Sequence, residues 1–271
     1  MNREKALQKI QNEIEKRGYE VSIKTTMKNG IEMEAFAFHG NEQITPLIYV
    51  NSFLKEAENG KSISKIAEEI IQIYQSNDGS ELVEISRLMD KDFMIPRLRM
   101  ALQKESRENI IKKTCELDGL ECYLYISDDQ KGYSFKVKEE HLSLLNMTTD
   151  EAFKVAEKQT FERSTIRTMA EMLGLYVEDD GGMFVVSVES GFRGAVSVLN
   201  KRMIQSKMEE LGNEEVREVL VLPSSIHECI VIPMVDEMED KSVYDEMVRQ
   251  VNTSEVDATE VLANQCYVMQ L

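Results

Sequence analysis

The dipeptide Asn29-Gly30 constrains the fold more than any other feature of the sequence. It stands between two runs, within residues 19–38, in which apolar residues recur at every second position. Both residues accept positive φ, which the two-residue turn of a β-hairpin requires. The pattern therefore predicts an antiparallel hairpin, and it favours antiparallel sheets over the parallel sheet of a doubly wound fold.

The rest of residues 1–78 predicts helices around this hairpin. A helix over 2–17 ends at Gly18, and "TPLIYV" at 45–50 is a third strand, after which Asn51 or Ser52 caps a short helix. A longer helix follows, with one apolar stripe made of Ile63, Ile66, Ala67, Ile70, Ile71 and Tyr74. The order α-β-β-β-α-α predicts an N-terminal subdomain over 1–78, which ends at the break Asn77-Asp78-Gly79.

Residues 79–166 predict a middle α+β subdomain. Residues 93–102 contain a proline and are expected to form an edge strand or an irregular segment, whereas 106–114 reads as a helix. A second hairpin joins 120–127 to 133–138 through a turn at 128–132. A helix over 147–160 follows, with Thr148 or Thr149 as its N-cap.

Residues 167–271 predict an acidic C-terminal subdomain with the order β-β-α-β-β plus helices. Residues 168–177 read as a helix that runs into a strand before a turn at 178–182. The expected elements that follow are strands at 183–189 and 195–200 paired around the loop 190–194, a helix over about 200–212, strands at 216–222 and 229–233, a helix carrying Val243, Met247 and Val251, a short helix opened by a capping box from Asp257 to Glu260, and a strand at 266–269. The fold class predicted for the chain is α+β, with antiparallel, hairpin-rich sheets and packed helices in two or three subdomains.

The negative charge of the chain is concentrated in its last third. Residues 171–271 hold 7 basic and 20 acidic side chains, whereas residues 1–100 hold 14 and 16, and residues 101–170 hold 11 and 13. Such a surface repels nucleic acid phosphates and attracts basic partners. A solvated face without a partner explains the same charge.

Several classes of protein are disfavoured by the sequence. The start "MNREKALQKI" is charged and amphipathic, unlike a signal peptide, and no apolar run reaches the length of a membrane span. The four cysteines, Cys115, Cys122, Cys229 and Cys266, have no metal-ligand spacing. They are expected to be free thiols in the cytoplasm.

The most distinctive polar stretch is the 223–228 turn, between the predicted strands 216–222 and 229–233. A structural reading explains it as a corner, stiffened by a proline and carrying a capping box from Ser225 to Glu228. In the functional reading, the turn binds a small polar group or a partner, and an arginine in the glycine-flanked 190–194 loop steers an anion. The candidate ligand- or partner-binding residues are Ser224, Ser225, His227, Glu228 and Arg193.

Catalysis is disfavoured at this turn. The Gly-x-Ser-x-Gly pattern of a nucleophile elbow is absent, and Val231 stands where a zincin motif needs its second histidine. The sequence therefore predicts no catalytic residue, no metal site and no cofactor.

Three motifs resemble a bacterial family known as domain-of-unknown-function family 5688. They are "TPLIYVNSF" at 45–53, Pro-Arg-Leu at 96–98, and "RGAVSVL" at 193–199 followed by "LPSSIHE" at 222–228. The resemblance extends over nearly the whole chain, although residues 99–126 depart from the family pattern. It implies a cytoplasmic bacterial protein, and it implies no activity or catalytic residue.

These observations predict a soluble, non-catalytic binding or interaction protein that uses its acidic C-terminal region. The expected partner is a basic protein; direct binding to nucleic acid or membrane is not expected, and the oligomeric state is left open. One alternative is a small-ligand-binding protein or hydrolase that uses the turn from Ser224 to Glu228. Another is a nucleic-acid mimic that inhibits a DNA-binding protein.

Overall fold

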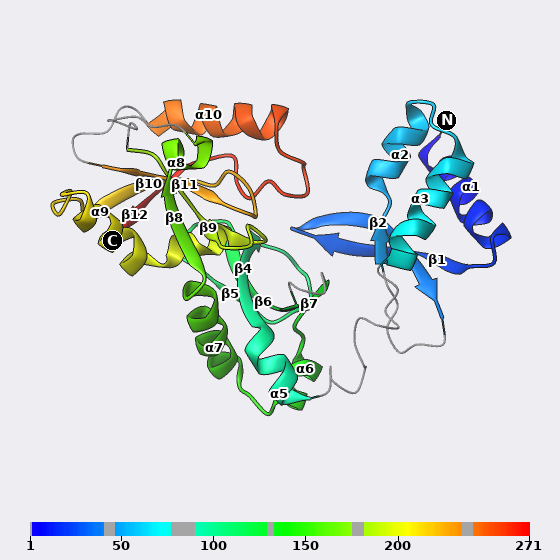
Figure 1. The fold of residues 1–271 in the computed structure, drawn as a ribbon, viewed down its shortest axis with the longest axis horizontal. Helices are drawn as coiled ribbons and strands as arrows, with labels where there is room; N and C mark the ends of the chain where they lie inside the picture. The colour runs from blue at the N-terminus through cyan, green and yellow to red at the C-terminus, as the bar shows by residue number, and fades with distance from the viewer. Residues whose placement is uncertain (1, 41–46, 77–89, 129–132, 175–181, 235–240) are drawn as a thin grey trace. The chain divides into compact units, whose positions relative to one another are not determined.

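The computed structural model describes residues 2–40, 47–76, 90–128, 133–174, 182–234 and 241–271. The chain divides into two compact units, Met1–Asp90 and Lys91–Leu271, and each is described by itself (Figure 1). The predicted break at 77–79 lies outside the described residues, as do most of the predicted turns at 128–132 and 178–182.

The first unit packs helices on a small antiparallel sheet. Its elements are α1 (Arg3–Lys16), β1 (Glu20–Lys28), β2 (Ile31–His39), β3 (Leu47–Tyr49), α2 (Asn51–Glu58) and α3 (Ile63–Ser76), and the strand order is β1-β2-β3. Asn29 and Gly30 form the predicted turn with φ of 50° and 73°, and Lys28 pairs with Ile31. The hairpin prediction is therefore confirmed.

One hydrophobic cluster holds this first unit together. The predicted stripes of α1 and α3 are buried against the sheet residues Val21, Phe36 and Phe38. Phe38 stacks on Tyr74 with ring centroids 4.3 Å apart. The predicted cap of α2 is wrong: the N-cap position is Val50, whose side chain cannot accept a hydrogen bond, and Asn51 is the first residue of the helix, where its amide oxygen accepts from Arg3.

The second unit contains two antiparallel sheets. Its first elements are α5 (Lys91–Met94), η1 (Ile95–Arg97), β4 (Leu98–Lys104), β5 (Lys112–Thr114), β6 (Leu120–Asp128), β7 (Tyr133–Lys136), α6 (Glu139–Leu145) and α7 (Thr149–Phe161). The rest are β8 (Ser164–Thr168), α8 (Met169–Leu173), β9 (Phe184–Val188), η2 (Gly194–Leu199), α9 (Lys201–Glu210), β10 (Glu218–Leu222), β11 (Cys229–Pro233), α10 (Lys241–Ser254) and β12 (Tyr267–Gln270).

The pairing within both sheets confirms the α+β fold class. In the smaller sheet β6 is central, with β4 and β5 on either side and β7 on a further stretch of β6. The larger sheet has the order β12-β10-β11-β9-β8, and every neighbouring pair is antiparallel. Helix α10 lies along one face of this larger sheet, over Leu220 and Leu222 (Figure 1).

A single hydrophobic cluster joins the two sheets of the second unit. It contains Leu124 of β6, Phe153 of α7, Phe184 of β9 and Val221 of β10. The predicted boundary between 166 and 167 falls inside β8, which the sequence pattern missed. A finer division of this unit into subdomains stays a prediction.

Two segments of the second unit differ from the predicted type of element. Residues 106–114 form an extended segment that ends in β5, not a helix, because Ser106 is tied through its backbone and hydroxyl to the carboxylate of Glu121. Residues 195–200 lie mostly in the 3-10 helix η2, and β9 pairs with β8 and β11 instead. Residues 194–198 are all buried, so burial on every side erased the periodicity that separates a helix from a strand.

Other predictions hold in part. Residues 93–102 divide into the end of α5, η1 and β4, and β4 is at the edge of its sheet, as expected for a segment containing proline. The stripe of Val243, Met247 and Val251 lies on α10, but these side chains are 51%, 43% and 40% exposed. The capping box at Asp257 opens no helix, because its carboxylate accepts from Thr259 within a turn.

Among the described helices, none combines the length and the apolar character that crossing a bilayer would require.

Candidate functional site

The 223–228 turn is held by its own backbone and by one serine. The Ser225 amide donates to the Glu228 carbonyl at 3.1 Å, and the His227 amide donates to Ser225 Oγ at 3.0 Å. The Ser225 hydroxyl therefore accepts from the amide two residues later, whereas in a capping box it would accept from the amide three residues later. No helix begins here. The predicted capping box is wrong for this reason, although the reading of the stretch as a corner between β10 and β11 matches its local geometry.

Three backbone contacts dock the turn onto neighbouring segments. Ile226 accepts from the amide of Ala195 at 3.3 Å and donates to the carbonyl of Glu260 at 2.8 Å. Ser187 Oγ on β9 donates to the His227 carbonyl at 2.8 Å. A Cβ built on Gly194 would lie 2.7 Å from that carbonyl and 2.3 Å from Ser187 Oγ. A glycine is therefore required at position 194, because the two segments of the chain lie too close together for a side chain.

The imidazole of His227 also bridges segments. Its Nδ1 lies 3.2 Å from the Arg193 amide, which donates to it, and 3.2 Å from the Gly191 carbonyl. Only one of these bonds forms in a given tautomer, because Nδ1 either accepts or donates. Nε2 lies 3.6 Å from Glu260 Oε1. Glu260 is a neighbour that sequence analysis missed, because the turn that carries it is far along the chain.

The guanidinium of Arg193 lies among three aromatic rings. It is 4.9 Å from the ring centres of Tyr125 and Phe192 and 5.7 Å from that of Tyr123, whose hydroxyl accepts from Nη1 at 2.7 Å. No carboxylate of the described residues forms an ion pair with this guanidinium. Cation–π attraction therefore fixes Arg193, whose φ of 56° is costly for a residue with a side chain. The sequence did not predict that Tyr123 and Tyr125 of β6 would contact Arg193.

A buried polar network adjoins these rings on the same sheet. Glu121 accepts from Gln103 at 2.8 Å and pairs with Lys112 at 3.1 Å, while Lys136 pairs with Glu108 and lies over the Tyr123 ring. Burial lowers the pKa of Lys136 below its ordinary value, and Glu108 opposes that shift. The charged groups near Arg193 are therefore largely matched within the fold.

The structure brings some of the five predicted residues together. Arg193, Ser225 and His227 meet where the 190–194 loop docks on the 223–228 turn. Ser224 and Glu228 are half-buried, and their side chains make no hydrogen bond or ion pair with the described residues. The hydroxyl and the imidazole that a ligand would use are engaged by backbone groups.

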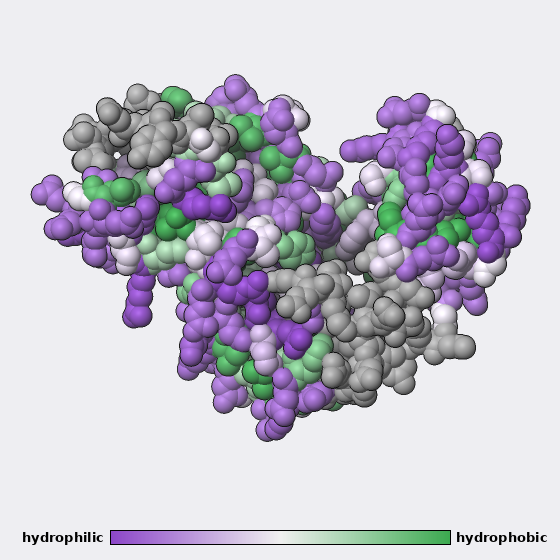
Figure 2. Space-filling view, viewed as in Figure 1, coloured by the Kyte–Doolittle hydropathy of each residue, from purple (hydrophilic) through white to green (hydrophobic). Residues whose placement is uncertain are grey.

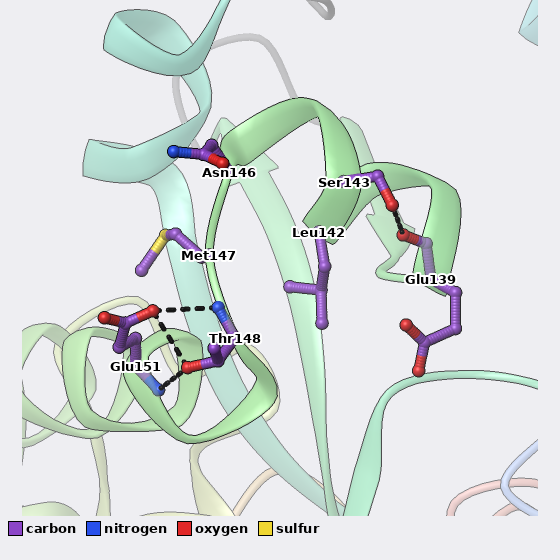
Figure 3. Close-up of a pocket in the computed structure, with 7 residues that line it drawn as sticks. All are labelled: Glu139, Leu142, Ser143, Asn146, Met147, Thr148 and Glu151. Atoms are coloured by element: carbon purple, nitrogen blue, oxygen red, sulfur yellow. Dashed lines mark hydrogen bonds between the residues drawn. The ribbon is translucent and has the colours of Figure 1, made fainter.

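A shallow pocket lies elsewhere, between α6 and α7 (Figure 3). Its polar groups are mostly paired with one another: Thr148, one of the two predicted N-caps, exchanges hydrogen bonds with Glu151 in a capping box, and Ser143 Oγ donates to the Glu139 carbonyl. None of the five predicted residues lines it. Within the described ranges, no three His, Cys, Asp or Glu side chains are grouped to hold a metal ion.

The described acidic residues of the last third are densest where α9 ends. We call Glu209, Glu210, Leu211, Glu214 and Glu215 the acidic corner; all five are exposed, Leu211 by 45%. Figure 2 shows mainly hydrophilic residues over α9 and the turn that follows it. Lys207 pairs with Glu210 at 3.1 Å, whereas the other three carboxylates have no ion pair with described residues.

Most of the charges at the ends of α9 oppose its helix dipole, with Lys207 of the last turn as the exception. Its first two residues are Lys201 and Arg202, and its last two are Glu209 and Glu210. Acidic side chains stabilise a helix at its N-terminus and basic ones at its C-terminus, each by about 0.3–1 kcal/mol. The order found in α9 is therefore unfavourable for helix stability.

A comparison with family models gives one match, which spans residues 3–270, to a family of unknown function, DUF5688. Comparisons with curated proteins and with solved structures give no significant match. The match extends over almost all of the chain and confirms the predicted resemblance. The chain belongs to the DUF5688 family.

Proposed function

We propose that the protein is a non-catalytic binding protein that recruits a basic partner through its acidic C-terminal region, with the acidic corner as the contact. The observation that carries the proposal is that four exposed glutamates lie within four residues of the exposed Leu211 along the chain. An apolar side chain with carboxylates nearby is complementary to a partner that presents lysine or arginine near an apolar residue.

The cost of this arrangement supports a binding role. Glu209 and Glu210 lie at the end of α9 where the helix dipole disfavours them, and Glu214 and Glu215 add like charge. Local rules of stability are broken most often where function requires it. A face that served only to keep the protein soluble has no need to place its acids there.

The geometry of the 223–228 turn favours binding over catalysis. Ser225 Oγ accepts from a backbone amide, and His227 Nδ1 faces the 191–193 backbone. A serine nucleophile needs its hydroxyl directed at the base that activates it. In this proposal the turn supports the fold of the second unit, and the protein acts in the bacterial cytoplasm, in keeping with its four unbridged cysteines.

Binding to a synthetic amphipathic peptide rich in lysine and arginine tests the proposal. A variant with Glu209, Glu210, Glu214 and Glu215 replaced by Gln should bind at least roughly tenfold more weakly at low salt, because close charge pairs contribute about 1.5 kcal/mol or more. The affinity of the wild type should fall steeply as salt rises.

A matched variant separates the acidic corner from net charge. It replaces four exposed glutamates of the first unit by Gln and changes the net charge equally, at Glu15, Glu20, Glu58 and Glu68. Its affinity should stay close to that of the wild type. Equal weakening in both variants would show that overall charge attracts the peptide, and the acidic corner would lose its role.

A further inference from the structure

The β5–β6 hairpin brings two of the four cysteines together. Cys122 on β6 pairs with Lys113 on β5, and Cys115 follows two residues after Lys113. Paired residues and every second residue along a strand share a face of the sheet. Cys115 and Cys122 are therefore diagonal neighbours on one face, and both contact the core of the second unit.

The two neighbouring thiols differ in exposure. Cys115 Sγ lies 3.5 Å from the Leu120 carbonyl oxygen and 3.7 Å from that of Leu117. Cys122 is 1% exposed, whereas Cys115 is only partly buried. The neighbouring Cys122 thiol lowers the pKa of Cys115, whereas the Cys115 thiol and burial both raise the pKa of Cys122. The more accessible sulfur is thus the more acidic one.

We propose that Cys115 and Cys122 are a redox-active thiol pair, which a hydroperoxide converts into an intrachain disulfide. The Cys115 thiolate attacks one oxygen of the peroxide, the O–O bond breaks, and the other oxygen leaves as an alcohol or water after taking a proton. The sulfenic acid formed on Cys115 is then attacked by the Cys122 sulfur. The S–O bond breaks, the hydroxyl leaves as water with the Cys122 proton, and the S–S bond forms.

Bond formation requires a small movement of Cys115. Diagonal neighbours in an antiparallel sheet have Cα atoms about 7–8 Å apart, and a disulfide needs roughly 4.4–6.8 Å. Cys115 can shift because it follows Thr114, the last residue of β5 that pairs with β6. The turn after it contacts the rest of the unit through the Glu116–Lys201 pair at 2.7 Å and through the Asp118 carbonyl, which accepts from Tyr267. Oxidation would strain these two contacts.

The remaining two cysteines are internal controls. Cys229 is fully buried, and burial raises its pKa; Cys266 is also buried, and the same effect raises its pKa to about 11. Neither has a second thiol among its hydrogen-bond partners, which are the Ala195 carbonyl for Cys229 and Lys241 and Asp245 for Cys266. Both are expected to react slowly with peroxide.

Treatment of the full chain with hydrogen peroxide, followed by mass spectrometry, tests the proposal. Trypsin releases residues 114–131 as one peptide that contains both cysteines. The oxidised peptide should lack two hydrogen atoms and regain them with dithiothreitol. Cleavage after Glu116 and Glu121 should leave the pieces 114–116 and 122–131 joined through their cysteines. Cys115 should react roughly tenfold faster than Cys229 or Cys266.

Two variants identify the roles within the pair. In Cys122→Ser the oxidation should stop at a Cys115 sulfenic acid that dimedone traps, and in Cys115→Ser residue 122 should stay unmodified. A wild-type protein in which Cys115 is over-oxidised without a linked peptide, or reacts no faster than Cys229, would overturn the proposal. This decision rests on the wild type and holds even if a variant is unstable.

Discussion

Gly194 marks the closest approach between the two loops that meet beside His227. A side chain there would meet Ser187 Oγ at 2.3 Å, the Val188 amide nitrogen at 2.5 Å and the His227 carbonyl oxygen at 2.7 Å. Two of these atoms are backbone and cannot turn aside. Gly194, which has no side chain, therefore fixes this junction together with the polar residues of the 223–228 turn.

Replacing Gly194 with Ala should destabilise the second unit by about 1–3 kcal/mol, because the docked loops must separate to make room. Urea unfolding followed by far-UV circular dichroism measures the change. The control is Gly40→Ala, where the added methyl meets only Tyr74 Oη at 3.9 Å, an ordinary contact. Equal stability of the two variants would mean that the junction adjusts freely.

At the scale of elements, the helix caps of the chain were predicted with mixed success. Thr148 is the N-cap of α7, as expected, and Glu151 completes a capping box there that was not predicted. The same spacing at Ser225 and at Asp257 leads into turns. The capping-box spacing alone therefore did not identify a helix in this chain.

Glu151→Gln should destabilise α7 at neutral pH and should have little effect in acid. The Glu151 carboxylate accepts from the amide and the hydroxyl of Thr148, both at 2.8 Å, and these bonds hold its pKa below the ordinary value. A lowered pKa in the folded state gives stability that is present above the unfolded pKa of about 4.3. This stability disappears as the pH falls through the folded pKa.

The measurement is the thermal midpoint of both proteins between neutral pH and the acid limit of solubility. The two curves should converge as the pH falls. Glu162→Gln makes the same charge change just after the other end of α7, where the helix dipole disfavours an acid, and it should cause no loss. A constant gap between wild type and Glu151→Gln at all pH values would contradict the assigned charge effect.

At the scale of the molecule, sequence patterns predicted most elements but not their long-range partners. The hairpin at Asn29-Gly30 and the stripes of α1 and α3 were readable because their signals are local. The contacts of Arg193 with Tyr123 and of His227 with Glu260 were not, because they depend on how distant segments are brought together. Residues 195–200 were predicted as a strand instead of the 3-10 helix η2, because a segment buried on all sides shows no periodicity.

The cores of the two units predict how fragments of the chain behave. Residues 91–271 produced alone should fold and unfold cooperatively in urea, since their hydrophobic cluster shares no residue with that of 1–90. Residues 79–166 alone should not, because this fragment takes Leu124 and Phe153 but leaves Phe184 and Val221 behind. A cooperative transition in the shorter fragment would show that the core divides near residue 166.

The position of β10 has a consequence for the synthesis of the protein on the ribosome. This strand lies between β11, its immediate successor in the chain, and β12, which follows it by more than 40 residues. Until the ribosome has released residues 267–270, the growing chain carries β10 with one row of amide and carbonyl groups open to other strands. We therefore expect incomplete chains that lack β12 to be more prone to pair with one another than the finished chain.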